Sequence, residues 1–153
     1  MQARVLRDEA AQEGFGARLA AACAGSALIF LEGDLGAGKT TMTRGFIRAL
    51  GQRGAVKSPT YTLIEPYDIG DRRVYHLDLY RVADPGELEY LGLREMLAED
   101  AVVLIEWAER GARWLPVPDL RVRIEHLSVG RRVKLEAATS KGGEIMARLE
   151  SNL

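Results

Sequence analysis

A glycine-rich segment at residues 33–40 constrains this chain more than any other feature. It reads Gly-Asp-Leu-Gly-Ala-Gly-Lys-Thr, which fits the phosphate-loop pattern of glycine, four free residues, glycine, lysine, and serine or threonine. An almost wholly apolar run at residues 26–31 precedes it, and apolar residues at helical spacing follow over residues 40–50. Because the motif requires this order of strand, loop and helix, we predict a nucleotide-binding unit of α/β type.

The residue types in this segment suit phosphate binding. Gly36 and Gly38 allow backbone angles that other residues disfavour, so that successive N–H groups can turn inward at a helix N-terminus. Lys39 supplies a mobile positive charge for the β and γ phosphates, and the Thr40 hydroxyl can ligate Mg²⁺. The residues expected to bind a nucleotide here are Gly36, Ala37, Gly38, Lys39, Thr40 and Thr41.

A phosphate loop also needs an acidic side chain near the metal, usually at the end of a second buried strand. The apolar run at residues 102–105 ends on Glu106, which would lie near Mg²⁺ or its water shell. Asp78 is the second candidate, on a strand where it would share one face with His76 and Tyr80. The alternatives are a solvated strand face for Asp78 and an ordinary strand-end carboxylate for Glu106. Two histidines far apart do not support a histidine metal site, so we expect His76 to be structural.

Two further segments have both a functional and a structural interpretation. Residues 58–62 follow the phosphate-loop helix, where many ATPases and GTPases have a mobile switch, and the hydroxyls of Ser58 and Thr60 could sense the γ-phosphate or the metal. A turn that enters a strand is the alternative. Trp107 follows the candidate metal-side glutamate, and it fits either a core aromatic residue or a contact for a ligand or partner.

The rest of the chain completes an α/β pattern. We expect helices from Asp8 or Glu9 to about Gly25, over residues 40–50, from Asp84 towards Leu91, and over residues 93–99 and 144–149. We expect strands at residues 26–31, 61–65, 73–80, 101–105, 120–127 and 131–137. The prediction is therefore a single P-loop NTPase-like domain over residues 1–153, an α/β fold with a mixed sheet of about seven strands and helices on both faces.

Composition limits the setting and the partners. A net charge of −1 excludes a bulk polycation, so nucleic acid could be bound only through a local patch. The single cysteine, Cys23, has no partner for a disulfide and is expected to be a small buried hydrophobic residue. The sequence has neither a signal-peptide pattern nor an apolar run of the roughly 18 to 20 residues that span a bilayer. We expect a cytoplasmic protein with no membrane contact.

Six short strings in the chain closely resemble, in order and spacing, the TsaE family. They lie at residues 33–41, 43–45, 56–63, 76–81, 87–89 and 105–107. The strings Ser-Pro-Thr-Tyr-Thr and His-Leu-Asp-Leu-Tyr-Arg are far more specific than a phosphate loop alone, and the resemblance covers about residues 8 to 149. TsaE proteins are the bacterial ATPase subunit for threonylcarbamoyladenosine in tRNA.

The resemblance implies roles for particular residues. Lys39 and the loop amides would bind ATP, and Thr40 with Glu106 would hold Mg²⁺. Asp78 would be the acid tied to hydrolysis, which makes Asp78, Glu106 and Lys39 the expected catalytic set. Trp107 would be functional, with Ser58 and Thr60, in the response to partners. Glu9 near the first helix and Arg131 at a hairpin turn are the expected contacts on the adenine side.

The resemblance also implies partners, namely the transferase subunit TsaD and its pseudo-enzyme companion TsaB, with tRNA contacted indirectly. The ATPase would reset their complex between turnovers. Without an evident arginine finger or water-positioning glutamine, we expect hydrolysis to be slow in the isolated chain and faster with partners.

Three other classes remain to be compared with this interpretation. A GTPase would need an Asn-Lys-x-Asp string, but the only asparagine is Asn152. A small-molecule P-loop kinase is the main alternative, although it usually needs a lid and an acceptor pocket. A non-catalytic binding module is disfavoured by the pairing of Thr40 with Glu106.

Overall fold

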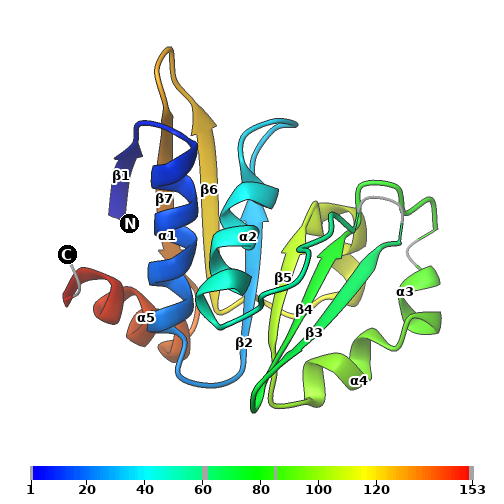
Figure 1. Cartoon of the computed structure of the whole chain (residues 1–153). Helices are drawn as coiled ribbons and strands as arrows, with labels where there is room; N and C mark the ends of the chain where they lie inside the picture. Colours follow the sequence, from blue (N-terminus) through cyan, green and yellow to red (C-terminus); the bar gives the residue numbers. More distant parts are fainter. Residues whose placement is uncertain (1, 60–61, 85, 152–153) are drawn as a thin grey trace.

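One seven-stranded mixed sheet runs through the molecule (Figure 1). The computed structural model describes residues 2–59, 62–84 and 86–151. The strands are β1 (Gln2–Leu6), β2 (Ala27–Glu32), β3 (Ile64–Ile69), β4 (Arg72–Asp78), β5 (Val102–Glu106), β6 (Leu120–His126) and β7 (Arg131–Ala137), in the order β1-β7-β6-β2-β5-β4-β3. The central strands β6, β2, β5 and β4 are parallel, and antiparallel pairs lie at both edges. This arrangement confirms the predicted α/β fold with a mixed sheet.

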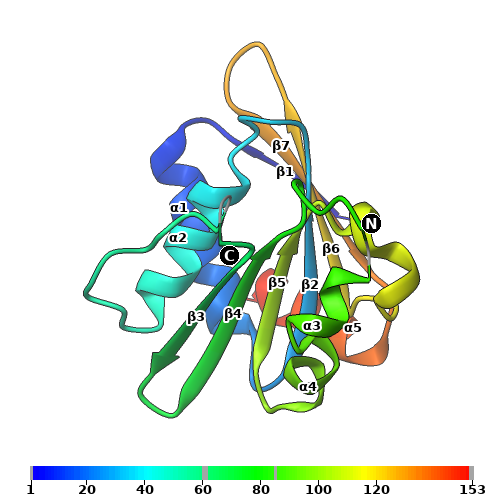
Figure 2. The same cartoon turned by 90° about the vertical axis from the view of Figure 1, so that its right-hand side faces the viewer.

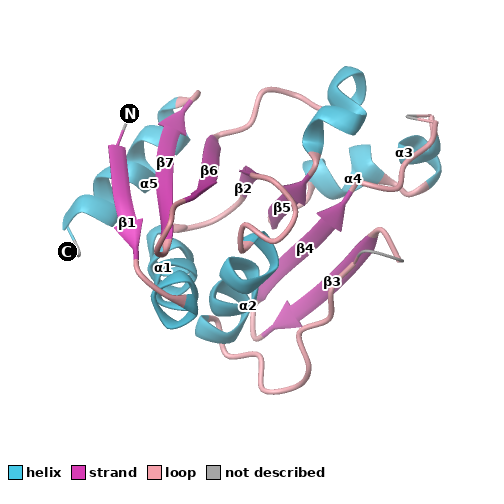
Figure 3. Ribbon diagram, turned by 90° about the horizontal axis from the view of Figure 1, so that it is seen from above, coloured by secondary structure: helices cyan, strands magenta, loops and turns pink. Residues whose placement is uncertain are grey.

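Helices cover both faces of the sheet, as the sequence predicts. One face carries α1 (Glu9–Ala22), α2 (Lys39–Ala49) and α5 (Ser140–Ser151); the other carries α3 (Glu87–Tyr90), α4 (Leu93–Ala98) and the 3₁₀ helix η1 (Ala108–Trp114). Figures 2 and 3 show α1 and α2 on one side and α3 and α4 on the other. Every residue of β2 from Ala27 to Leu31 is buried, because side chains on both of its faces meet a hydrophobic core.

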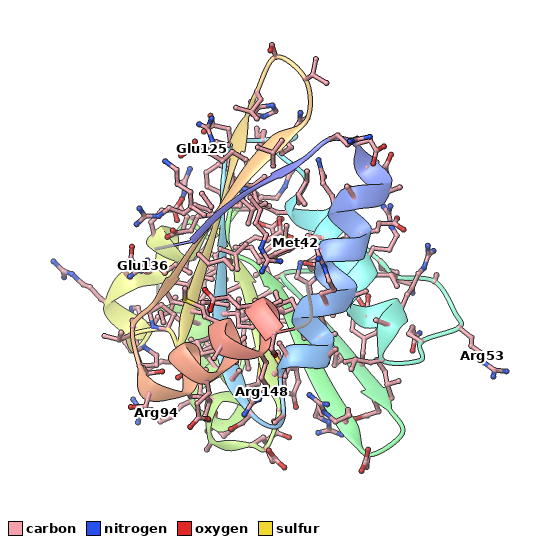
Figure 4. All side chains as sticks on the ribbon, turned by 90° about the vertical axis from the view of Figure 1, so that its left-hand side faces the viewer. Met42, Arg53, Arg94, Glu125, Glu136 and Arg148 are labelled. Atoms are coloured by element: carbon pink, nitrogen blue, oxygen red, sulfur yellow. The ribbon has the colours of Figure 1, made fainter. Side chains whose placement is uncertain are left out.

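Helix α1 packs closely on α2, which begins at the phosphate loop. The Asp8 side chain caps α1 by accepting a hydrogen bond of 2.8 Å from the Ala11 N–H. Gly16 of α1 faces the α2 backbone at Met42, and Gly45 of α2 faces the α1 backbone at Glu13, with no room for a Cβ atom at either glycine. In Figure 4 Met42 points into the interior, whereas Arg53 and Arg94 lie at the periphery. The two glycines let the helices approach closely.

Several element boundaries differ from the predicted ones. The strand expected at residues 61–65 is β3, Ile64–Ile69, and it includes Pro66, which an edge strand tolerates because one side of its backbone has no strand partner. Strand β4 ends at Asp78, two residues early. Helix α5 begins at Ser140, ahead of the predicted start at residue 144, and includes the two glycines at positions 142 and 143. The sequence patterns indicated neither β1 nor η1.

No helix among the residues that the structure describes is long and apolar enough to span a membrane.

Candidate nucleotide-binding site

The glycine-rich segment forms a tight loop between β2 and α2, as predicted. Gly36 and Gly38 have φ angles of 78° and 111°, in the region that favours glycine. A Cβ atom at Gly38 would collide with the side-chain amide of Gln12, a buried residue of α1. Helix α2 then begins at Lys39, so the loop delivers its backbone N–H groups to a helix N-terminus.

A cavity of about 220 Å³ opens where this loop meets the ends of β4 and β5. Its lining residues are Leu35, Gly36, Gly38, Lys39, Thr40, Thr41, Asp78, Glu106 and Trp107. The two acids meet there because β4 and β5 are parallel neighbours in which Asp78 stands directly opposite Glu106. Glu106 in turn lies opposite Leu31 of β2, the strand that leads into the loop. Eight of the nine residues are predicted site residues, and Leu35 is the addition.

The Lys39 ammonium group is held inside the site. Its Nζ donates a hydrogen bond of 2.5 Å to the Gly33 carbonyl and lies 3.7 Å from the ring centroid of Trp107. Burial lowers the pKa of Lys39, and the nearby carboxylates of Glu106 and Asp78 oppose that shift. An anion that enters the cavity would therefore meet a desolvated lysine.

Glu106 is buried and has two polar neighbours. The Thr40 hydroxyl donates to its Oε2 across 3.5 Å, and the Nε2 of His76 lies 2.5 Å from the same oxygen. His76 is fully buried on β4, and its Nδ1 has no hydrogen-bond partner within the described part of the chain. His76 thus contacts a predicted site residue, which its sequence context did not indicate.

Asp78 is buried, with 6% of its surface exposed, so the alternative of a solvated strand face is wrong. Its Oδ1 accepts a hydrogen bond of 3.0 Å from the Tyr80 N–H. Burial raises the pKa of the Asp78 carboxyl, and the neighbouring Glu106 adds to the shift. Because the strand ends here, Tyr80 does not continue the alternation of His76 and Asp78 along β4.

Trp107 joins the site to the hydrophobic core. It has left-handed backbone angles, with φ at 58°, which are uncommon for a residue other than glycine. One side of its ring faces the Lys39 ammonium group, and its centroid lies 4.9 Å from that of Tyr80. Trp107 also packs at the edge of the core beneath α3 and α4, so it is both a wall of the cavity and part of the hydrophobic packing.

Four of the predicted residues that the structure describes lie outside the cavity lining. Ala37 belongs to the loop but is fully buried, whereas the Glu9 carboxylate is largely exposed and lies 3.5 Å from Arg44. Arg131 contacts the loop itself, where its guanidinium donates to the carbonyls of Ala37 and Gly36 at 3.1 and 3.4 Å. Ser58 is exposed on the segment between α2 and β3, and Thr60 lies outside the described residues.

The sheet order, the loop between β2 and α2, and the two strand-end acids define an α/β protein of the P-loop NTPase-like class. A family model described as "Threonylcarbamoyl adenosine biosynthesis protein TsaE" matches residues 6–133. The chain belongs to the TsaE family.

Individual relatives support the same assignment. The chain is 48% identical over 120 residues to the tRNA threonylcarbamoyladenosine biosynthesis protein TsaE of Haemophilus influenzae, a match that covers 78% of this chain and 76% of that protein. It is 46% identical over 98 residues to the TsaE protein of Bacillus subtilis, covering 64% of this chain and 61% of that protein. The crystal structure of Bacillus subtilis YdiB superposes with a TM-score of 0.81 at 30% identity, covering 99% of this chain and 95% of the other.

Proposed function

We propose that this protein is the ATP-binding and ATP-hydrolysing subunit required for threonylcarbamoyl modification of the tRNA adenosine next to the anticodon. Membership of the TsaE family supports the pathway, since relatives are named as tRNA threonylcarbamoyladenosine biosynthesis proteins. The observation that carries the ATPase is the convergence of Lys39, Thr40, Asp78 and Glu106 on one cavity beside a phosphate loop. We further propose that the protein works in the cytoplasm, in the pathway of tRNA modification that its relatives' names give.

The residues around the cavity fit Mg²⁺. The Thr40 hydroxyl and the Glu106 carboxylate are hard oxygen donors, they lie within 3.5 Å of each other, and both face the cavity that the loop borders. These two residues would hold the ion, and His76 keeps the Glu106 carboxylate in place. When bound, Mg²⁺ would neutralise negative charge on the phosphates.

The protein groups would then divide the work of hydrolysis. Lys39 and the loop N–H groups bind the phosphates, which requires the ammonium group to exchange the Gly33 carbonyl for a phosphate oxygen. Asp78 orients a water molecule and accepts its proton as the water oxygen bonds to the γ-phosphorus and the bond to the β–γ bridging oxygen breaks. Its raised pKa favours proton uptake.

The site also supports dependence on partners. Lys39 is the only cation among the described residues that line the cavity. An arginine supplied in trans can raise such a reaction by about 10³ to 10⁵. We infer slow hydrolysis by the isolated chain and at least a tenfold rise with the transferase subunit TsaD and its companion TsaB. The response to partners would depend on Ser58, Thr60 and Trp107. The structural support concerns Trp107, whose ring lies over the ammonium group of Lys39 that must bind phosphate.

The test is steady-state phosphate release by the full chain, with and without purified TsaD and TsaB, at one salt concentration. Slow turnover alone and a rise of at least tenfold with partners are expected. Fast turnover by the isolated chain, or no response to partners that bind, would contradict the proposal. Transfer of phosphate to added metabolites would indicate a small-molecule kinase instead.

A further inference from the structure

Arg131 ties the β6–β7 hairpin to the phosphate loop. It is the first residue of β7, and the hairpin rises beside the loop that precedes α2 (Figures 1 and 2). Its guanidinium uses all three nitrogens on backbone carbonyls: Nε donates to Ala37 at 3.1 Å, Nη2 to Gly36 at 3.4 Å, and Nη1 to Gly130 at 2.8 Å. Two of these bonds fix carbonyl groups of the loop from outside the cavity, which Arg131 does not line.

These bonds determine where the loop N–H groups point. A trans peptide is planar, and its C=O and N–H bonds point in opposite directions. The carbonyl of Ala37 and the N–H of Gly38 belong to one peptide, so holding the Ala37 oxygen towards Arg131 directs the Gly38 N–H away from it. Gly38 lines the cavity, whereas Ala37 does not. The preceding peptide is fixed at both ends, because Arg131 binds the Gly36 carbonyl and the Ala37 N–H donates to Asp34 at 3.0 Å.

The peptide between Ala37 and Gly38 needs such an external contact. Position 38 must be glycine, because buried Gln12 occupies the space of a Cβ atom and φ is 111°. Glycine, however, accepts many backbone angles at similar energy, so this peptide can rotate and turn its carbonyl inward at little cost. A carbonyl turned inward would repel a phosphate instead of donating to it.

We propose that Arg131 is a positioning residue for nucleotide binding, which holds the Ala37 carbonyl outward and thereby keeps the Gly38 N–H directed into the phosphate site. This inference rests on the proposed ATP binding at the loop, and it assigns Arg131 an action through the protein backbone. Binding then needs no reorientation of the loop, which favours affinity.

Calorimetric titration of the full chain with ATP and with inorganic triphosphate tests this role. Arg131→Ala is expected to weaken both ligands about tenfold or more, as when one hydrogen bond to a charged group is lost. Arg131→Lys keeps the charge but replaces the planar guanidinium, whose separate nitrogens bond the Ala37 and Gly36 carbonyls, with one flexible ammonium group, so a loss of at least fivefold is expected to remain. Arg132→Ala is the matched control, because Arg132 is the next residue of β7, points to the other face and lies 3.5 Å from Glu125.

Each departure from this pattern contradicts the role. Full affinity in Arg131→Lys would make the charge alone responsible, and a loss for ATP but not for triphosphate would place Arg131 on the adenosine. Thermal unfolding of each variant distinguishes a local effect on the loop from a general loss of structure. An unchanged melting temperature with weaker binding supports the positioning role, whereas a melting temperature that falls in parallel with affinity contradicts it.

A second readout does not depend on affinity. Amide NMR of Gly38 should show a large downfield shift on triphosphate binding in the wild type and Arg132→Ala, and a reduced shift in Arg131→Ala. If the wild type binds neither ATP nor triphosphate, the proposed function fails. If the wild type binds and Arg131→Ala binds equally well with the same Gly38 shift, only the positioning role is overturned.

Discussion

The Nε2 of His76 lies 2.5 Å from Oε2 of Glu106, and both side chains are buried on neighbouring parallel strands. The contact joins a residue with no obvious role in the sequence to the predicted metal-side acid. A buried carboxylate without hydrogen-bond partners is costly, so His76 stabilises the site as well as the fold.

Removing His76 should therefore destabilise the protein. His76→Ala leaves a cavity and removes a hydrogen bond from a buried carboxylate, and we expect the free energy of unfolding to fall by about 2 to 4 kcal/mol. Urea denaturation measures the change. The other histidine, His126, is exposed, and His126→Ala should change the unfolding free energy by no more than about 0.5 kcal/mol. Equal midpoints for the two variants would show that the His76 contact contributes nothing.

Substitutions at Glu106 and at Lys39 should affect ATP binding and ATP hydrolysis differently. Glu106→Gln keeps the size of the side chain and the loop intact, so ATP affinity should stay within a few fold while phosphate release is lost. Lys39→Ala should lose affinity as well, because its charge contacts the phosphates before reaction. Calorimetry and phosphate-release assays distinguish the two. Normal turnover in Glu106→Gln would remove that residue from the site.

Asp78 should affect activity without supporting stability at neutral pH. Burial raises its pKa in the folded protein, so the folded state holds the proton more tightly than the unfolded chain. The unfolding free energy therefore falls as pH rises from the unfolded pKa of about 4 through the raised folded pKa. Asp78→Asn should be at least as stable as the wild type at pH 7, yet hydrolyse ATP far more slowly.

Thermal unfolding at pH 7 and at acidic pH checks this sign. The stability difference between Asp78→Asn and the wild type should shrink as the pH falls. A large loss of stability at pH 7, with a proportionate loss of activity, would instead make Asp78 a structural carboxylate.

The close approach of α1 to α2 should depend on Gly16. Gly16→Ala would push a Cβ atom against the backbone of Met42 and Phe46, and we expect a loss of about 1 to 3 kcal/mol in unfolding free energy. Gly14 lies in the same helix with open space around it, so Gly14→Ala should stabilise by about 0.5 to 1 kcal/mol. Chemical denaturation of the two variants measures both changes in unfolding free energy. A Gly16→Ala variant as stable as the wild type would contradict the close contact between α1 and α2.

Cys23 should be unreactive in the folded protein. Burial raises the pKa of its thiol to about 11, and only the thiolate reacts with alkylating agents. Alkylation by iodoacetamide at pH 8, followed by mass spectrometry, should be at least about 100-fold slower in the native protein than in urea. Because the chain has one cysteine, the measurement needs no second variant. Comparable rates in both states would contradict the burial of Cys23.

The elements next to the phosphate loop were predictable because short stretches of consecutive residues determine them. The apolar runs that became β2 and β5 and the glycine spacing before Lys39 each depend on a few consecutive residues. The acid at the end of β5, Glu106, was accessible for the same reason. These features account for most of the cavity lining.

Strand β1 was not predictable in this way. Its five residues form a strand because they pair with β7, more than 120 residues away, and their own pattern is too short to indicate it. The early end of β4 has a local cause, since the Tyr80 N–H donates to the side chain of Asp78 two residues before it. An aspartate inside an alternating pattern can equally stay in the strand, so the pattern alone did not place this end.

The sequence by itself determined the loop, its lysine and threonine, and the two acids that end their strands. Only the tertiary structure decided that His76 meets Glu106, that Trp107 covers Lys39, and that Arg131 binds the loop carbonyls. The physical reason is that a turn or a strand follows from neighbouring residues, whereas a contact between side chains on different elements follows from strand order and register, which the whole sheet fixes together.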